Sequence, residues 1–298
     1  MHTNIVDTHA IYTRLLAEPD AATREQILRD DLLAPFNGLF QIFGGADPVQ
    51  MLRQWHMYGP EDFVSDQRET IRTLLDQLAA VGAWEQTART LADVRQAFAP
   101  YRERIPLNEV AFGLLLADFS HNKMADRGYT GFGGIPGWVM VIYGEVNDYT
   151  AARIQGTTAH EMLHNIHFSV QPFNPMTVTV GEYIVAEGLA ESFAAELYGA
   201  EIVGYYVTDF DDAQIDSAKE IIGAGLERSG FDVVRGYIFG DSLAEEWGFT
   251  KAGIPDYAGY AIGYRIVQAY LRKTGKTVPE AIFVPAREII AESGYFVG

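Results

Sequence analysis

Apolar residues recur at steps of three and four along the first third of the chain, which is the spacing of one face of an α-helix. This pattern predicts helices over residues 11–16, 27–33, 71–81 and 91–98. Prolines and glycines separate these segments, and Pro100 and Pro106 end the series. We therefore expect an N-terminal helical region over residues 1–105.

Two short apolar runs in the middle of the chain have the composition of β-strands. Residues 110–119 are compact and apolar, and residues 138–143 (Trp-Val-Met-Val-Ile-Tyr) are rich in β-formers and bracketed by glycines. The glycine-dense segment 128–137 lacks the GxxxxGK(S/T) pattern of a phosphate-binding loop, so we interpret it as a shaping loop. His121, in the loop before it, could reach a substrate, but it is a loop histidine with no partner in view, which disfavours that role.

The remainder of the chain again has helical periodicity. It predicts helices over about residues 147–168, 181–199, 211–226, 231–240 and 257–273. Asn147, Asp148 and Thr150 offer side chains that can cap the first of these helices. Together the patterns predict an α+β fold that is mostly helical with a small mixed sheet, and a second region over residues 106–298.

The composition excludes several classes of partner and site. The chain has 298 residues and a formal net charge of −18, which argues against binding to nucleic acid or an anionic membrane, because both attract positive surfaces. It has no cysteine, so any metal must be bound by His, Asp or Glu. We find no secretory leader or spanning segment and expect a cytoplasmic protein, although the mature form of an exported protein would look the same. The oligomeric state stays open.

The segment His160-Glu161-Met162-Leu163-His164 is an HExxH motif within the predicted helix 147–168. In a helix the two histidines lie on one face and can bind one Zn²⁺, while Glu161 lies beside the open position and can take a proton from an activated water. Apolar neighbours indicate a buried helix, in which these polar side chains need partners. A metal ion would supply them. The alternative is a helix with packed histidines and a surface glutamate.

Glu187 and Glu191 lie four residues apart, on one face of the predicted helix 181–199. That face is otherwise small and apolar, so two like charges there are costly unless a positive group compensates them. We expect Glu187 to be the third zinc ligand and Glu191 to accept a hydrogen bond from the non-coordinating nitrogen of a zinc-bound histidine. The opposite assignment is open, as is a helix with two solvated glutamates.

These motifs resemble those of gluzincins, the thermolysin-type and zinc aminopeptidase-type enzymes in which a glutamate from a second helix is the third zinc ligand. The order of HExxH, EGLAE (187–191) and GYAIGYRIV (259–267) more closely resembles a bacterial family of predicted zinc-dependent proteases, catalogued as a domain of unknown function. The resemblance covers roughly residues 106–295. It implies a zincin-like fold with the sheet beside the HExxH helix, and a role for Tyr260 or Tyr264 in stabilising the oxyanion.

One spacing departs from the gluzincin pattern. Between His164 and Glu187 there are 22 residues, a few more than in the best-known gluzincins. This difference concerns the register of the third ligand and does not affect the HExxH motif itself.

Our hypothesis is a zinc metallopeptidase with one Zn²⁺ per chain on His160, His164 and Glu187. Glu161 is the expected general base, and the expected substrate is a peptide or protein, bound in extended form at the sheet edge near residues 138–143. One alternative is a non-catalytic zinc-binding scaffold or interaction protein, and another is a metal-free helical scaffold. A structural zinc site generally fills its fourth position with another Cys or His, so three ligands and a base favour the enzyme.

Overall fold

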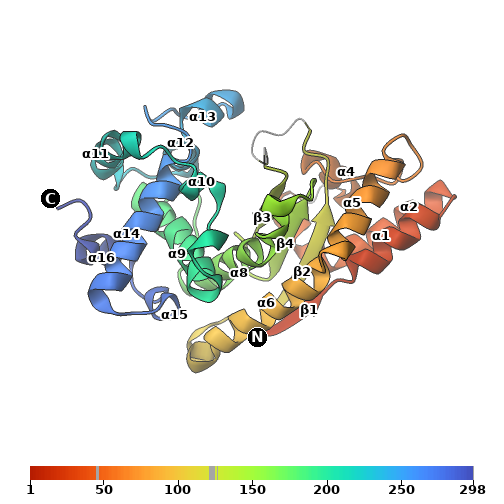
Figure 1. The fold of residues 1–298 in the computed structure, drawn as a ribbon, viewed down its shortest axis with the longest axis horizontal. Coiled ribbons are helices and arrows are strands. Elements are labelled where there is room, and N and C mark those ends of the chain that lie inside the picture. The colour runs from red at the N-terminus through yellow and green to blue at the C-terminus, as the bar shows by residue number, and fades with distance from the viewer. Residues whose placement is uncertain (45–46, 121–124, 126, 298) are drawn as a thin grey trace. The chain divides into compact units, whose positions relative to one another are not determined.

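The structure is a computed structural model that describes residues 1–44, 47–120, 125 and 127–297 (Figure 1). His121, the loop histidine, lies outside the described residues. Helices predominate, and one four-stranded sheet has the order β1-β2-β4-β3. The strands are β1 (His2–Ile5), β2 (Glu109–Leu116), β3 (Tyr129–Phe132) and β4 (Trp138–Tyr143). The predicted α+β class, mostly helical with a small mixed sheet, is confirmed.

The helices agree closely with the apolar periodicity. Before β2 they are α1 (Thr8–Ala17), α2 (Ala21–Ile27), the π-helical η1 (Leu28–Leu33), the 3₁₀ turn η2 (Ala34–Phe36), α3 (Asn37–Ile42), α4 (Pro48–Gln54), α5 (Arg68–Ala80), α6 (Ala83–Ala97) and the 3₁₀ segment η3 (Ala99–Arg104). After β4 they are α7 (Asp148–Ala151), α8 (Ile154–Val170), α9 (Val180–Tyr198), η5 (Ala200–Ile202), α10 (Tyr205–Thr208), η6 (Asp212–Gln214), α11 (Ile215–Gly225), α12 (Phe231–Phe239), α13 (Asp241–Trp247), α14 (Ala258–Thr274), α15 (Val278–Ala281) and α16 (Ala286–Ser293). All four helices predicted before residue 105 are present, the second as α2 continued by η1.

Strands β2 and β4 form the buried centre of the sheet. β2 pairs in parallel with β1 and β4, and β3 pairs with β4 in the antiparallel direction. Every residue of β2 after Glu109 is buried, as is every residue of β4 after Trp138. Strands covered on both faces have no polar side to alternate with, which explains their continuous apolar runs. Both strands confirm the sequence prediction.

The sheet ends at β3, which lies within the segment 128–137 that we interpreted as a loop. Because β4 has a neighbour on both sides, it is not an edge strand, and the expectation of a substrate-binding edge at residues 138–143 is wrong. The edge strands of the described sheet are β1 and β3, and β3 is the one next to β4. A strand of four residues that includes Gly131 has too little β-forming sequence to be recognised from its pattern.

The described chain divides by its contacts into two compact units. One unit contains Met1–Arg95 and Leu107–Asn165, and the other contains Gln96–Pro106 and Ile166–Gly298. β1 pairs with β2, so the N-terminal region shares its core with the sheet. Our division near residue 105 into a helical region and a second domain stays a prediction.

In the first unit, N-terminal helices pack against the sheet. α1 and α5 pack on β2, as Figure 1 shows. Phe132 of β3 packs against Phe43 and Trp55, with ring centroids 6.0 and 5.2 Å away. Gly113 of β2 leaves room for the ring of Phe36, which a Cβ atom at Gly113 would approach to 3.1 Å. Gly113 and Phe132 are both aligned with Met140 and so lie on one face of the sheet, which is packed by aromatic side chains.

In the second unit, α9 and α14 form the central helix pair, and α16 packs against both (Figure 1). The 3₁₀ segment η3 and the end of α6 belong to this unit: Phe98 packs against Phe193 of α9, and the Arg104 guanidinium lies 3.7 Å from the ring centroid of Phe283. The core of the second unit thus takes in residues that lie between β1 and β2 in the chain.

Two helix starts differ from the sequence prediction. Asn147 and Thr150 form a capping box, but it caps the one-turn helix α7, and the HExxH helix α8 begins separately at Ile154. α9 begins at Val180, one residue before the predicted Gly181, because Thr179 and Glu182 form a second capping box. The short helix α7 and the following turn therefore interrupt what the periodicity predicts as one helix.

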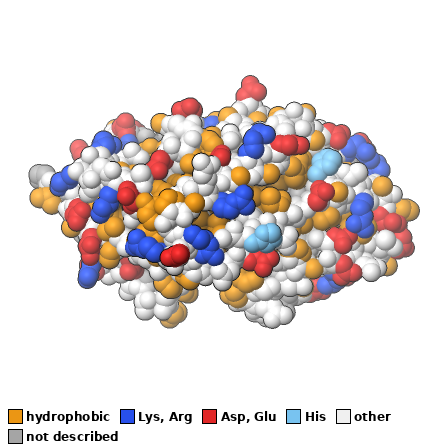
Figure 2. All heavy atoms as spheres, turned by 90° about the horizontal axis from the view of Figure 1, so that it is seen from below, with side chains coloured by type: hydrophobic (Ala, Val, Ile, Leu, Met, Phe, Trp, Pro, Cys, Tyr) orange, Lys and Arg blue, Asp and Glu red, His pale blue; other side chains and the backbone are white. Residues whose placement is uncertain are grey.

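Two surface properties bear on possible partners. No helix in the described part of the chain is long and apolar enough to cross a membrane. On the face that Figure 2 shows, acidic and basic side chains are interspersed. The expectations that the protein binds neither nucleic acid nor membranes stay predictions.

Candidate metal centre

Helix α8 holds the HExxH motif in a buried position. His160, Glu161 and His164 are 5%, 8% and 5% exposed. The two histidines lie one turn apart, with ring centroids 4.6 Å apart and Nε2 atoms 2.9 Å apart. Two imidazole nitrogens that face each other at this distance either share one proton or give their lone pairs to a common metal ion.

Glu187 of α9 joins the two histidines in one group. The ligand atoms of His160, His164 and Glu187 all lie within 4.8 Å of one another. Glu187 is only 4% exposed, so its charge is costly unless a positive group compensates it. Two imidazoles and one carboxylate form a known ligand set of catalytic zinc sites, which keep a fourth position open. The three side chains therefore fit Zn²⁺ and could hold a metal ion.

A close crossing of α9 and α14 fixes the backbone next to Glu187. A Cβ atom at Gly188 would overlap the carbonyl oxygen of Gly263, and one at Gly263 would overlap the carbonyl oxygen of Ile184. The two backbones can approach this closely because neither glycine has a side chain. The glycines of EGLAE and of the segment 259–267 therefore have a packing role that their sequence context alone does not reveal.

Glu161 lies against the edge strand β3. A Cβ atom at Gly131 would overlap Glu161 Oε1 and lie 2.6 Å from Cδ, and one at Gly133 would overlap the main-chain carbonyl oxygen of Glu161. These two glycines make room for the glutamate of the motif. The density of glycines in the segment 128–137 could have indicated a close contact. The contacting residue, Glu161, lies about thirty residues later, so no local sequence pattern identifies it.

Asn165 is a further residue of the site that the sequence analysis missed. It directly follows the motif, is fully buried, and forms hydrogen bonds with main-chain groups of the β3–β4 turn. An asparagine inside a largely apolar helix could have indicated a buried polar side chain with specific partners. Asparagine is a weak helix former whose side chain competes for backbone hydrogen bonds, so a buried one needs specific partners.

Glu191 lies one turn after Glu187 on α9 and is also buried. Its Oε2 accepts a hydrogen bond from the main-chain N–H of Gly204, with an N···O distance of 2.8 Å. This bond ties the segment that follows α9 back to the helix. The predicted hydrogen bond between Glu191 and a zinc-bound histidine stays a prediction.

Tyr260 and Tyr264 lie one turn apart on α14 and are both partly buried. Tyr260 packs against Tyr206, with ring centroids 4.4 Å apart. Burial raises the pKa of the Tyr264 hydroxyl, and the negative charge of Glu191 raises it further. Tyr264 therefore remains a hydrogen-bond donor well above neutral pH. The role of either hydroxyl at an oxyanion stays a prediction.

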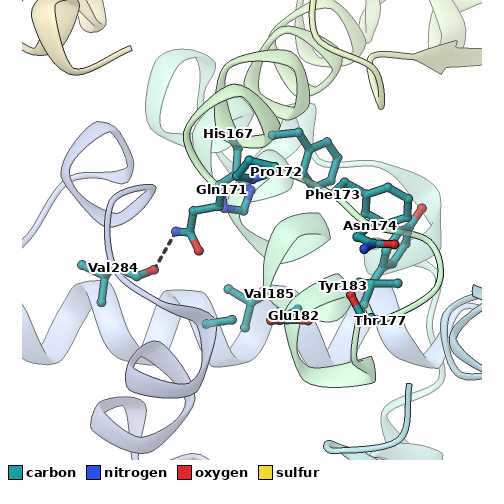
Figure 3. Close-up of a pocket in the computed structure, with 13 residues that line it drawn as sticks. His167, Gln171, Pro172, Phe173, Asn174, Thr177, Glu182, Tyr183, Val185 and Val284 are labelled. Atoms are coloured by element: carbon teal, nitrogen blue, oxygen red, sulfur yellow. Dashed lines mark hydrogen bonds between the residues drawn. The ribbon is translucent and has the colours of Figure 1, made fainter. Parts of the chain in front are cut away.

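A pocket of about 140 Å³ lies at the end of α8 and the start of α9, and Figure 3 shows it. Figure 3 also shows Gln171, whose Nε2 donates hydrogen bonds to the carbonyl oxygens of Ile282 and Val284. The pocket is lined by His167, Phe168, Gln171, Pro172, Phe173, Asn174, Thr177, Val178, Glu182, Tyr183, Val185, Val284 and Ala286. None of the HExxH residues and neither Glu187 nor Glu191 lines it.

Comparisons with known proteins agree with this geometry. Residues 83–291 match a protein family described as "Predicted Zn-dependent protease (DUF2268)". The uncharacterized protein YjfC of Bacillus subtilis (strain 168) is 43% identical over 202 residues, which are 67% of this chain and 67% of YjfC. No solved structure matches the chain. The matched family region includes α8, α9 and α14.

Proposed function

The chain belongs to the family of predicted Zn-dependent proteases, as its motifs indicate, and we propose that it is a zinc-dependent peptidase. One Zn²⁺ per chain would be held by His160, His164 and Glu187. The observation that carries this proposal is the convergence of the three ligand atoms within 4.8 Å, with Glu161 next to His160 in the same buried helix.

Zinc bound to these side chains would supply Lewis acidity, which would polarise a carbonyl group and lower the pKa of a water molecule to about 7. Glu161 is the proposed general base. Its carboxylate takes a proton from the attacking water and then passes it to the leaving amine. The close approach of Gly131 supports this role, because it restricts where the Glu161 carboxylate can lie.

We propose that the substrate lies along β3 as an extended peptide. The outer side of β3 has no neighbouring strand in the described sheet, so its backbone groups can pair with an added strand. Gly131 lies within β3 and against Glu161, so a peptide paired with β3 would pass close to the base. A zincin-like fold is part of the same proposal.

Three other side chains have proposed supporting roles. Tyr264 is the better supported oxyanion donor, because Gly263 before it contacts Gly188 and because the charge of Glu191 acts on its hydroxyl. Tyr260 is the second candidate. Glu191 would orient a zinc-bound histidine through a hydrogen bond, in addition to the one it accepts from Gly204. We further propose a cytoplasmic location, which rests on the sequence alone.

A second candidate function is a zinc-binding protein without catalysis. The low exposure of all three ligands favours it, since a structural zinc ion needs no access for a substrate. It leaves two features without a purpose. Among the described residues the site has three protein ligands, whereas structural zinc is nearly always held by four. Glu161 would be a buried carboxylate beside the site with no proton to transfer.

The direct test is cleavage of a mixed peptide library by zinc-loaded protein, analysed by mass spectrometry with and without a chelator. We expect defined cleavage products that disappear when the metal is removed and return when zinc is restored. A protein that binds zinc but leaves every peptide intact would support the non-catalytic candidate. Cleavage that persists in the chelator would contradict both zinc proposals.

A further inference from the structure

Asn165 connects the metal-binding helix to the turn between β3 and β4 through four main-chain groups. Its side chain is fully buried. The Nδ2 atom lies within hydrogen-bond distance of three carbonyl oxygens and Oδ1 accepts from one N–H: Gly133 O at 3.1 Å, Ile135 O at 2.7 Å, Trp138 O at 2.8 Å and Gly137 N at 2.8 Å. One side chain therefore binds three of the five residues between β3 and β4 and the first residue of β4.

This arrangement is specific to an asparagine side chain. Its amide offers two donor hydrogens and one acceptor oxygen on the same short side chain, and the turn presents carbonyl groups and an N–H on matching sides. An apolar residue of equal size would leave several main-chain groups unpaired, and each buried unpaired group is costly. A weak helix former at position 165 is thus explained by bonds to residues 27 to 32 positions earlier in the chain.

The turn that Asn165 holds is the one that brings β3 to Glu161. Gly133 is both a hydrogen-bond partner of Asn165 and in contact with the Glu161 main chain, and Gly131 lies against the Glu161 carboxylate. Asn165 and Glu161 lie four residues apart, on one face of α8. If the turn moved, both the register of β3 and the space around the carboxylate would change.

We infer that Asn165 is a positioning residue. It holds the edge strand β3 at a fixed position along the HExxH helix, so that a peptide paired with β3 is aligned with Glu161. The inference rests on the proposed peptidase function. The inference goes beyond that function because it assigns the alignment of the substrate with Glu161 to the Asn165 side chain, which contacts neither the substrate nor the Glu161 carboxylate.

The test compares Asn165→Asp, which keeps the size but replaces the amide donors with a carboxylate, and Asn165→Ser, which is small enough for water to enter. Thr158→Val is the control: Thr158 is fully buried in α8, and its hydroxyl donates only within the helix, to Ile154 O at 2.7 Å. Each protein is compared for zinc content, for amide hydrogen exchange over residues 129–143, and for kcat and KM on a peptide that the wild type cleaves.

We expect both Asn165 variants to keep one zinc per chain, to exchange faster over residues 129–143, and to lose about 100-fold in kcat/KM, the cost of a misplacement of about 1 Å. Thr158→Val should change neither zinc content, nor exchange over residues 129–143, nor kcat/KM, even if it lowers thermal stability as much as the Asn165 variants do. Faster exchange with cleavage within about threefold of the wild type would overturn the positioning role, as would unchanged exchange.

The wild-type protein provides a readout that does not depend on a variant that folds. The amide of Gly137, bonded to Asn165 Oδ1, should exchange among the slowest in residues 129–143, and rapid exchange there would overturn the inference. A wild-type protein that cleaves no peptide would end the proposed function and the alignment role together. The exchange data would then still show whether Asn165 holds the turn.

Discussion

The substitution Gly188→Ala adds one methyl group where α9 and α14 cross, directly after the proposed ligand Glu187. The new Cβ atom would overlap the carbonyl oxygen of Gly263 and lie 3.0 Å from the main-chain nitrogen of Tyr264. Backbone atoms cannot rotate away as a side chain can. The two helices must therefore separate by about 1 Å to restore a normal carbon–oxygen contact of about 3.3 Å.

The cost of Gly188→Ala follows from two opposing terms. Overpacking against backbone costs about 3 kcal/mol, the upper end of the usual range, and alanine regains about 1 kcal/mol over glycine in a helix interior. The free energy of unfolding should fall by about 2 kcal/mol, which lowers Tm by about 3 °C for a chain of this length. Zinc affinity should also fall, by about 10-fold or more, because the displaced helix carries Glu187.

Thermal denaturation and competition with a chelating dye measure both effects. Gly223→Ala in α11 is the matched control: its Cβ atom would lie 3.0 Å from the ring of Phe296, a side chain near the C-terminus that can move. We expect Gly223→Ala to lose neither stability nor zinc. A Gly188→Ala protein with the Tm and zinc affinity of the wild type would refute the close crossing and its part in placing Glu187.

Three further predictions concern single side chains. Glu187→Ala should nearly abolish zinc binding in a dialysis assay, whereas Glu191→Ala should lower affinity by about 10- to 100-fold; the reverse result would exchange their roles. Tyr264→Phe should lower kcat by about 10²- to 10³-fold, and Tyr260→Phe by much less. Steady-state kinetics measure both variants, and a larger loss for Tyr260→Phe would contradict the assignment. Burial raises the pKa of Glu196 above its usual 4.5 and the charge of Glu280 adds to this, so ionisation of Glu196 destabilises the folded state as pH rises. Glu196→Gln should therefore exceed the wild type in stability at pH 7, and the difference should vanish below the usual pKa; equal stability at both pH values would contradict it.

The parts of the fold that the sequence predicts are those with a local cause. The helix around His160 and His164 and the helix around Glu187 follow from motif and periodicity, and the buried strands follow from continuous apolar runs. β1 has no such signal, because its four residues are mostly exposed and it is held by pairing with β2. Its existence depends on a strand more than a hundred residues later in the chain.

The candidate site shows the same limit at the level of single residues. The grouping of His160, Glu161 and His164 could be predicted, because HExxH fixes their spacing within one helix, and Glu187 was expected from its buried place on a second helix. Gly131, Gly188 and Asn165 could not, because each is explained by a contact with a distant part of the chain: Gly131 with Glu161, Gly188 with Gly263, and Asn165 with the β3–β4 turn. A resemblance between motifs points to the chemistry, whereas such contacts place the groups that perform it.

The most direct test of the account is Glu161→Gln beside the wild type, with zinc content, Tm and peptide cleavage measured on the same preparations. Glutamine keeps the size and helix propensity of glutamate but cannot take a proton from water. We predict one zinc per chain, a Tm close to that of the wild type, and a loss of cleavage of at least about 10². Unchanged cleavage with zinc still bound would contradict the proposed mechanism, even if the metal site itself were correct.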